Sequence, residues 1–373
     1  MSKIWFEILQ SPDQSDLPTP GSSDYQWQAL FACQIGVLNH QNWTNLKWGF
    51  NAGALFEEAM ERQKLFLESQ HALDADVRFE IPNIRTLGLR YISHNSEGLS
   101  IALIGKVSAK TREQAETAAD EYYRELKATF PYDYSLSPAI SRDEFFGITG
   151  SEVLIRSSEQ MDIVQVKRCE TFMPLNRRLP CLQGLWQSSG RAHEQIWRSL
   201  SAGHNQILVN VMLRPTILYD EELEFYANLA SEFENYQSVD NHKKLFNVYK
   251  EWCESYIKRR LTPWKKFFYL QFHIASVGEI TEGFVRSMGT VLTQNSSIQA
   301  LPGYQVVRPP LNQKKEWGEK IYKMEITSLD SQLLNPRLSE VADLEEVFSA
   351  IRIPYSPPGG DLLGFKYLPI MGE

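Results

Sequence analysis

The chain has 373 residues, of which 43% are hydrophobic and 23% are charged, and its formal net charge is −8. This length allows two domains, or one extended domain, with a sizeable core. The acidic balance repels nucleic acid and anionic lipid, so contact with either requires a local basic patch. The sequence has no run of about 18 apolar residues, and its N-terminus does not resemble a signal peptide. We therefore expect a cytoplasmic protein that does not insert into a membrane.

The residues that usually bind metals are scattered. The four cysteines lack the paired spacing of zinc ligands, and the seven histidines are isolated from one another. His193-Glu194 lacks the second histidine of the H-E-x-x-H motif. The simplest interpretation of the cysteines is reduced thiols in the cytosol. We expect neither a metal site nor a cofactor.

Residues 1–85 form the first predicted segment. They contain a short opening strand, a loop over 11–24 rich in Ser, Pro, Asp and Gly, an apolar segment over 25–38, and a helix over 51–70. The segment has no sharp pattern of its own, so we place its boundary at the change in periodicity near Thr86.

Residues 86–180 are predicted to form a first α+β lobe. Alternating residues over 87–93, a turn, and a more buried run over 99–107 indicate a β-hairpin. Thr111, with Gln114 three residues later, marks the start of a helix through a capping box. Its apolar face is Ala115, Ala118, Ala119, Tyr122 and Leu126. Further short strands are predicted over 152–156 and 163–169.

Residues 181–350 are predicted to form a second, related lobe. The patterns indicate strands over 206–213, 267–275 and 320–327, and helices over 193–200, 243–260 and 281–293. Another helix begins at Asp220, where three acidic residues suit the positive end of a helix dipole. Because the hairpin has no crossover, we predict an α+β fold of mostly antiparallel sheets, with amphipathic helices packed on one face and two related lobes.

The sequence lacks the common catalytic motifs. Gly105-Lys106 fails as a phosphate loop because Val107 stands where a hydroxyl is needed and no glycine precedes it at the required spacing. Ser188 and His193 lie close together, but they lack a nucleophile elbow and suit a helix cap better. We expect no catalytic residues and no enzyme activity. A hydrolase or nuclease site assembled from distant carboxylates stays open.

A basic and aromatic stretch follows the helix over 243–260. Cations and aromatic rings interleave there, as phosphate contact and base stacking require. The favoured interpretation is a helix C-terminus that attracts cations and two core tryptophans. A nucleic-acid-binding module stays open as the alternative, carried by Lys258, Arg259, Arg260, Trp264, Lys265 and Lys266.

The most distinctive feature is the end of the chain, residues 351–373, which we call the connector. A helical pattern over 344–350 leads into Ile351-Arg352-Ile353-Pro354-Tyr355-Ser356, followed by Pro357-Pro358-Gly359-Gly360 and then Gly364. Neither a helix nor a central strand can continue through the Pro-Pro-Gly-Gly run. The connector therefore marks a structural boundary.

The connector and the α+β units before it resemble the N-terminal, non-motor region of HerA-like translocation ATPases and the related ATPases of type IV secretion. In that family the connector leads into the motor domain, whereas this chain ends at Glu373. The resemblance implies a non-catalytic accessory subunit that works with a separately encoded phosphate-loop ATPase. The expected partner-binding residues are Ile353, Pro354, Tyr355, Pro357, Pro358 and Phe365. Homo-oligomerisation stays open, and so does closure of the connector over this chain's own sheet.

Overall fold

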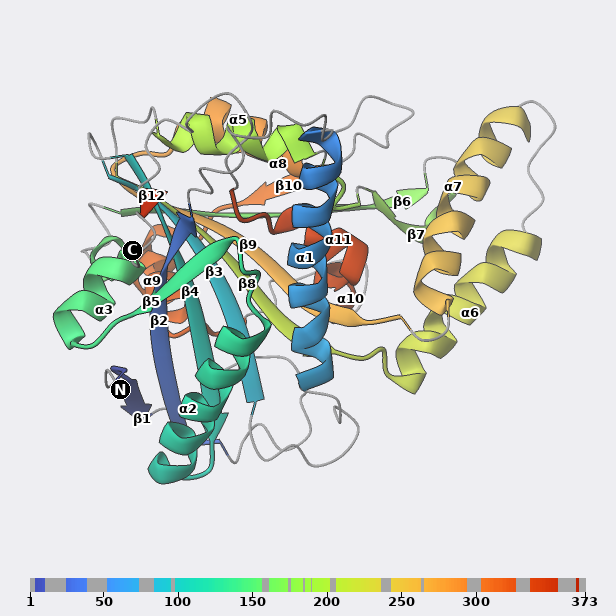
Figure 1. Cartoon of the computed structure of the whole chain (residues 1–373). Coiled ribbons are helices and arrows are strands. Elements are labelled where there is room, and N and C mark those ends of the chain that lie inside the picture. Colours follow the sequence, from blue (N-terminus) through green and yellow to red (C-terminus); the bar gives the residue numbers. More distant parts are fainter. Residues whose placement is uncertain are drawn as a thin grey trace.

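The computed structural model describes residues 4–10, 25–38, 52–73, 84–94, 98–155, 161–173, 176–183, 185–188, 190–201, 206–235, 243–262, 265–293, 303–326, 336–354 and 367–368. These residues form an α+β fold built on one sheet (Figure 1). The predicted fold class is confirmed.

The strands of the sheet follow the order β1-β2-β4-β3-β8-β9-β6-β10. Strands β5 and β12 also pair with β2, while β7 pairs with β6 and β11 with β9. Neighbouring strands are antiparallel, except that β12 runs parallel to β2. The strands are β1 (Glu7–Gln10), β2 (Trp27–Leu38), β3 (Ile84–His94), β4 (Gly98–Ala109), β5 (Tyr134–Pro138), β6 (Met161–Met173), β7 (Asn176–Gln183), β8 (Ile207–Thr216), β9 (Phe267–Val277), β10 (Tyr304–Val307), β11 (Val341–Asp343) and β12 (Tyr367–Leu368).

One face of the sheet carries a large apolar cluster covered by several helices. Leu89 of β3 and Leu103 of β4 belong to this cluster, and so do Tyr122 and Trp197 of the covering helices. These helices are α1 (Ala52–Leu73), α2 (Arg112–Thr129), α5 (Gly190–Ser201), α8 (Glu282–Leu292) and α11 (Leu344–Ala350). Burial of this face is the main source of the fold's stability.

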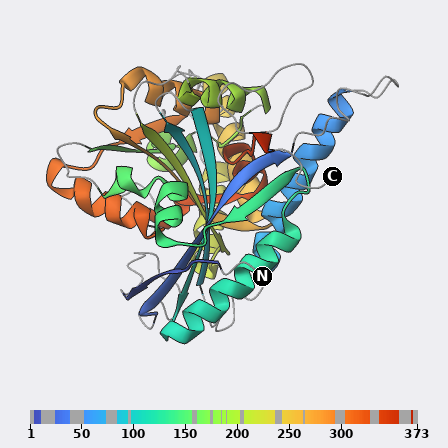
Figure 2. The same ribbon diagram turned by 60° about the vertical axis from the view of Figure 1, so that its left-hand side comes forward.

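Helices also cover the opposite face, so the prediction of helices on one face alone is wrong. Phe145, Leu154 and Trp317 pack there against Ala102 and Ile104 of β4. They come from α3 (Arg142–Thr149), α4 (Ser151–Leu154) and α9 (Lys314–Tyr322), and Figure 2 shows helices on both sides of the sheet. The apolar run of β4 agrees with this arrangement, because a strand buried on both faces is apolar at successive positions.

A separate apolar cluster joins the remaining helices to the sheet. α6 (Asp220–Asn235) and α7 (Lys243–Leu261) pack on each other and extend away from the sheet (Figure 1). Tyr226 of α6 and Tyr256 of α7 meet Tyr269 of β9 and Leu338 of α10 (Pro336–Glu340) in this cluster. A short 3₁₀ helix, η4 (Leu311–Gln313), precedes α9.

Several predicted elements are confirmed. The predicted hairpin consists of β3 and β4. Ile84 pairs with Ser108 at one end and His94 pairs with Gly98 at the other. The hydroxyl of Thr111 accepts a hydrogen bond from the N–H of Gln114 and so caps α2, and all five residues of its predicted apolar face are buried. The acidic start of α6, the helices α7 and α8, and the strands β8 and β9 also lie where they were predicted.

Two predicted strands are helices. Residues 152–156 were expected to be a strand, but α4 occupies Ser151–Leu154. Residues 320–327 alternate as a strand does, yet α9 continues to Tyr322 and then ends in a Schellman motif. There the N–H of Glu325 donates to Lys320 O at 2.9 Å, and the N–H of Met324 donates to Ile321 O at 3.2 Å.

The sheet connects the two segments that were predicted as lobes. β3 of the first predicted lobe pairs with β8 of the second. Leu87 pairs with Leu213 at one end of the ladder and Ile92 pairs with Leu208 at the other. The predicted boundaries at 85, 180 and 350 stay predictions. Within the described part of the chain, no helix has both the length and the apolar character needed to cross a membrane.

Candidate functional site

The connector begins where α11 ends. A capping box starts this helix: the Asp343 carboxylate accepts from the N–H of Glu346 at 3.1 Å, and Glu346 accepts from the N–H of Asp343 at 3.1 Å. The N–H of Ile351 donates to Val347 O and closes the last turn. Ile351 is extended, with φ −112 and ψ 117, and Pro354 disfavours the helical conformation at Ile353 before it. We call Ile351–Pro354 the exit segment.

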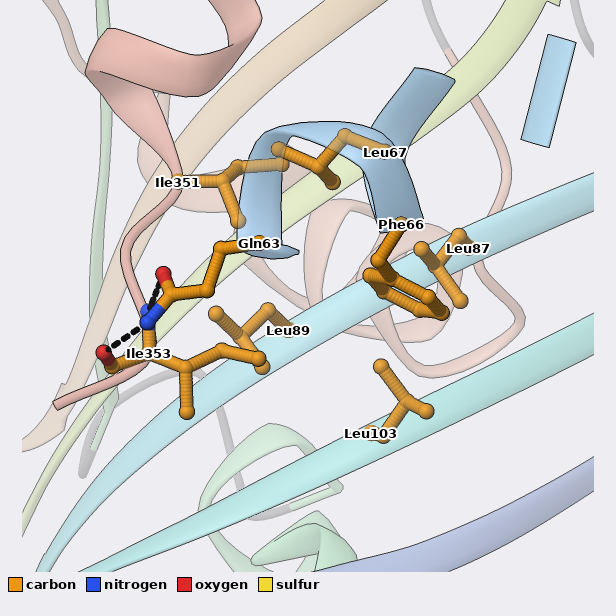
Figure 3. A pocket seen from close by; sticks show the side chains of 8 residues that line it. All are labelled: Gln63, Phe66, Leu67, Leu87, Leu89, Leu103, Ile351 and Ile353. Carbon is orange, nitrogen blue, oxygen red and sulfur yellow. Dashed lines mark hydrogen bonds between the residues drawn. The ribbon is translucent and has the colours of Figure 1, made fainter. Parts of the chain in front are cut away.

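The backbone of the exit segment is held by three side chains. The amide of Gln63 donates to Ile353 O at 2.8 Å and accepts from Ile353 N at 3.0 Å, so it pairs with this residue as a neighbouring strand would (Figure 3). The Tyr134 hydroxyl donates to the same carbonyl at 3.2 Å. The Tyr91 hydroxyl donates to Arg352 O at 2.6 Å. The base of the connector is therefore fixed to α1 and to the sheet.

The side chains of Ile351 and Ile353 complete an apolar wall between α1 and the sheet. They line a cavity together with residues of α1, β3 and β4 (Figure 3): Gln63, Phe66, Leu67, Leu87, Leu89 and Leu103. Its volume of about 10 Å³ is near the minimum that one water molecule needs, whereas ligand pockets hold several hundred Å³. The cavity is a packing gap and not a binding site for a cofactor.

These contacts correct part of the partner prediction. Ile353 is 3% exposed and Pro354 is buried, so both belong to this chain's own core. The prediction that these two residues belong to an open docking surface is therefore wrong. Tyr355, Pro357, Pro358 and Phe365 lie outside the described residues.

The pair of Ser188 and His193 lies beside the exit segment and fixes α5 to α11. The Ser188 hydroxyl donates to Ser349 O at 2.5 Å, and His193 Nε2 lies 2.7 Å from the same oxygen and 2.8 Å from the hydroxyl. Because a carbonyl oxygen can only accept, both groups donate to it and the hydroxyl proton is not directed at the imidazole. Burial lowers the pKa of His193 to about 3, so the ring is neutral. This geometry does not activate a nucleophile.

Three cations of the basic stretch, Arg259, Arg260 and Lys265, lie against the start of α11. Arg259 donates through Nε and Nη2 to the two carboxylate oxygens of Asp343. Lys265 Nζ lies 3.0 Å from the same carboxylate. Arg260 is fully buried, with Nη2 2.7 Å from Glu346 Oε2. The nucleic-acid prediction is therefore wrong for Arg260, because this charge neutralises an internal carboxylate.

The remaining members of the basic stretch differ among themselves. Lys266 pairs with Glu68 of α1. Lys258 is exposed, and Trp264 lies outside the described residues. Since Arg259 and Lys265 also pair with Asp343, the five described residues of this stretch do not form one solvent-facing surface.

The same ionic cluster includes a second buried arginine, from β6. Arg168 Nη1 lies 3.0 Å from Glu346, and Nη2 donates to Ser339 O at 2.7 Å and to Val341 O at 2.8 Å. Glu346 thus neutralises two fully buried guanidiniums, Arg168 and Arg260. The cluster ties β6 and α7 to the helix that leads into the exit segment.

A polar row crosses the opposite face of the sheet under α9. Arg90, Asn210, His273 and Gln165 lie in register on β3, β8, β9 and β6. Arg90 donates to Asn210 Oδ1 and to Ile321 O, each at 2.7 Å. Burial lowers the pKa of His273 to about 3. Among the described residues, no group of three or more His, Cys, Asp or Glu side chains is arranged to hold a metal ion.

The residues that anchor the exit segment were not predicted from the sequence. Gln63 interrupts the apolar stripe of α1, and a buried glutamine at such a position is the one signal that could have indicated a backbone partner. Tyr91 and Tyr134 looked like ordinary strand and core residues. No protein-family model and no curated protein matches the sequence.

Proposed function

We propose that this chain is a non-catalytic accessory or assembly subunit that partners a separately encoded HerA-like ATPase in a translocation or defence machine. The resemblance of the connector to the segment that precedes the motor domain in that family supports this assignment. The observation that carries it is the double hydrogen bond between Gln63 and Ile353, which fixes the point from which the connector leaves the fold.

A connector that is rigid at its base suits a docking function. The sheet and α1 hold the backbone just before Pro354, so the connector leaves the fold from a defined point. Prior ordering of a binding segment lowers the entropy lost on association. Further along, Tyr367–Leu368 pairs with Val37–Leu38 of β2 in parallel, which brings the end of the connector back to the sheet.

Co-expression with a phosphate-loop ATPase encoded beside this gene tests the proposal. We expect the two proteins to co-purify and to form a complex of defined stoichiometry in size-exclusion chromatography with light scattering. Failure of the full-length chain to bind that ATPase, together with a monomeric state alone, would contradict the proposed function.

Two matched variants locate the interaction. Gln63→Leu removes two hydrogen bonds to the exit segment, each worth about 0.5–1.5 kcal/mol, so we expect about tenfold weaker binding of the ATPase. Gln114→Leu makes the same change at an exposed position on α2 and should leave the affinity unchanged. Equal affinities for the two variants would show that the exit segment does not contribute to binding.

A further inference from the structure

Arg352, in the middle of the exit segment, is a buried cation that has no oxygen acceptor among the residues that the structure describes. The residue is 8% exposed, and its guanidinium carbon lies 3.6 Å from the centre of the Phe348 ring. Nη1 lies 2.9 Å from the sulfur of Met60, and Nε has no hydrogen-bond partner. Sulfur is a weak acceptor, so this guanidinium is poorly satisfied.

Other buried arginines of the chain are better paired. Arg168 and Arg260 share the carboxylate of Glu346, and Arg168 also donates to the carbonyl oxygens of Leu338, Ser339 and Val341. Among the described residues, the two terminal nitrogens of Arg260 make no hydrogen bond, but its charge lies 2.7 Å from Glu346 and its Nε donates to the Tyr256 hydroxyl. Arg90 has no carboxylate, but it donates to three oxygens, those of Asn210, Thr149 and Ile321. Arg352 is different, because within the described part of the chain its guanidinium contacts an aromatic ring and a thioether, while Glu345 acts on it through its charge.

The charge of Arg352 persists despite burial. Burial lowers its pKa to about 10, while Tyr91 and Glu345 act in the opposite direction. At neutral pH the side chain is therefore a cation, and a buried cation without a partner is unfavourable unless another group compensates for it. The stacking on Phe348 compensates in part.

We propose that Arg352 is the residue by which the exit segment recognises a protein partner, and that it pairs there with a carboxylate of that partner. The inference rests on the proposed function of the connector. The backbone of the exit segment does not need to detach, because Tyr91 and Gln63 hold its carbonyls and leave the side chain out of their contacts. The side chain rotates off Phe348 and exchanges a sulfur for two carboxylate oxygens.

The choice of a carboxylate follows from the chemistry of the guanidinium and from its surroundings. The planar fork of arginine matches a carboxylate with two parallel hydrogen bonds. Around α11 this chain already pairs arginines with carboxylates: Arg259 bonds Asp343 through two nitrogens, and Nη2 of Arg260 lies 2.7 Å from Glu346. Position matters as well, since Arg352 lies two residues before Pro354, where the connector leaves the core.

Isothermal titration of the neighbour-encoded ATPase tests the inference. The ATPase is titrated into wild type, Arg352→Met and Arg352→Lys, once free of nucleotide and once loaded with ADP. We expect the methionine variant to bind at least tenfold more weakly in both states, and the lysine variant to bind with intermediate affinity. Equal affinity of wild type and Arg352→Met overturns the inference. A loss confined to the ADP-loaded ATPase overturns the carboxylate and indicates a phosphate.

The isolated chain gives an independent measurement. Arg352→Met should unfold at the same temperature as wild type or higher, because an unsatisfied charge is replaced by an apolar side chain next to Met60 and Phe348. The matched variant Arg90→Met should unfold at a lower temperature, because three oxygen acceptors lose their donor. Equal destabilisation by both changes would make Arg352 a structural residue and overturn the inference.

A small dicarboxylate separates this inference from the proposed function. Glutarate, compared with sodium chloride at equal ionic strength, should raise the unfolding temperature of wild type more than that of Arg352→Met. If wild type shows this difference but does not bind the ATPase, the proposed function fails and the carboxylate assignment stands. If wild type and Arg352→Met bind the ATPase with equal affinity and show equal shifts in unfolding temperature with glutarate, the assignment of Arg352 fails and the proposed function stands.

Discussion

Replacing Glu346 with glutamine removes one negative charge from the ionic cluster around α11 while nearly preserving the shape of the side chain. Glu346 is fully buried and lies 3.0 Å from Arg168 and 2.7 Å from Arg260. The amide can still accept a hydrogen bond from Asp343 N, so the cap of α11 survives. The variant loses the neutralisation of two buried guanidiniums.

The magnitude depends on the acceptors that each arginine retains. Breaking a buried ion pair from one side costs about 3–5 kcal/mol, because a charge is left uncompensated. Arg168 keeps three backbone carbonyl acceptors, at Leu338, Ser339 and Val341. Arg260 keeps the Tyr256 hydroxyl at 3.0 Å, with Asp343 4.0 Å away. These remaining acceptors place the expected loss near the lower end of that range, at about 3 kcal/mol.

Equilibrium unfolding in urea measures this loss directly, with a parallel thermal scan. Glu345→Gln is the matched control on the same helix: its carboxylate is 58% exposed and pairs with Lys64, so we expect a change below about 1 kcal/mol. A loss below about 1 kcal/mol for Glu346→Gln would refute the view that this carboxylate is the essential counter-charge of the cluster.

Two further predictions concern pH and packing. Because burial lowers the pKa values of His193 and His273 from the ordinary 6.5 to about 3 in the folded chain, the unfolded chain binds protons that the folded chain does not. The free energy of unfolding should therefore fall by about 2–3 kcal/mol as the pH falls from 7 to 5.5. His71, whose pKa is also lowered by burial, acts in the same direction. Urea unfolding at the two pH values measures this difference. A flat response would contradict the neutral burial of these rings. For packing, Gly105→Ala places a methyl group inside the contact distance of the buried Phe31 ring and should cost about 1–3 kcal/mol, whereas Gly147→Ala in α3 meets no atom within 4 Å and should stabilise by about 0.5–1 kcal/mol. Equal thermal shifts for the two variants would refute this account.

The elements predicted best from the sequence are those in which period and boundary signals agree. In α2, the cap at Thr111 and the apolar face through Leu126 point to the same helix, and the hairpin before it shows an alternating strand, a turn and a more apolar strand. The α+β class follows from such elements. The two failures, in α4 and α9, lie where the apolar spacing suits either period and where the tertiary environment decides.

The end of α9 shows why local patterns failed there. Met324 adopts φ 56, a left-handed conformation that usually requires glycine. Its side chain packs against Gly88 of β3, where an added Cβ would clash with the methionine methyl carbon. This contact joins residues far apart in the sequence, and no local signal around Met324 reveals it.

The candidate site shows the same limit. The Pro-Gly run indicated a boundary, and the helix before it is α11 as predicted. The interactions that hold the exit segment are long-range, since Gln63 lies 290 residues from Ile353 and Tyr91 lies 261 from Arg352. The basic stretch likewise looked open because its counter-charges, Asp343 and Glu346, come from another part of the chain.

The pairing of β3 with β8 also sets an order on synthesis. Arg90 of β3 and Asn210 of β8 are hydrogen-bonded across 120 residues, so one side of the first hairpin has no neighbour until the ribosome has produced the second half of the sheet. At about 5–20 residues per second this interval lasts about 6–24 s. During that time the edge of β3, from Leu87 to Ile92, lacks its β8 partner, and unpaired strand edges of this kind favour pairing with other chains.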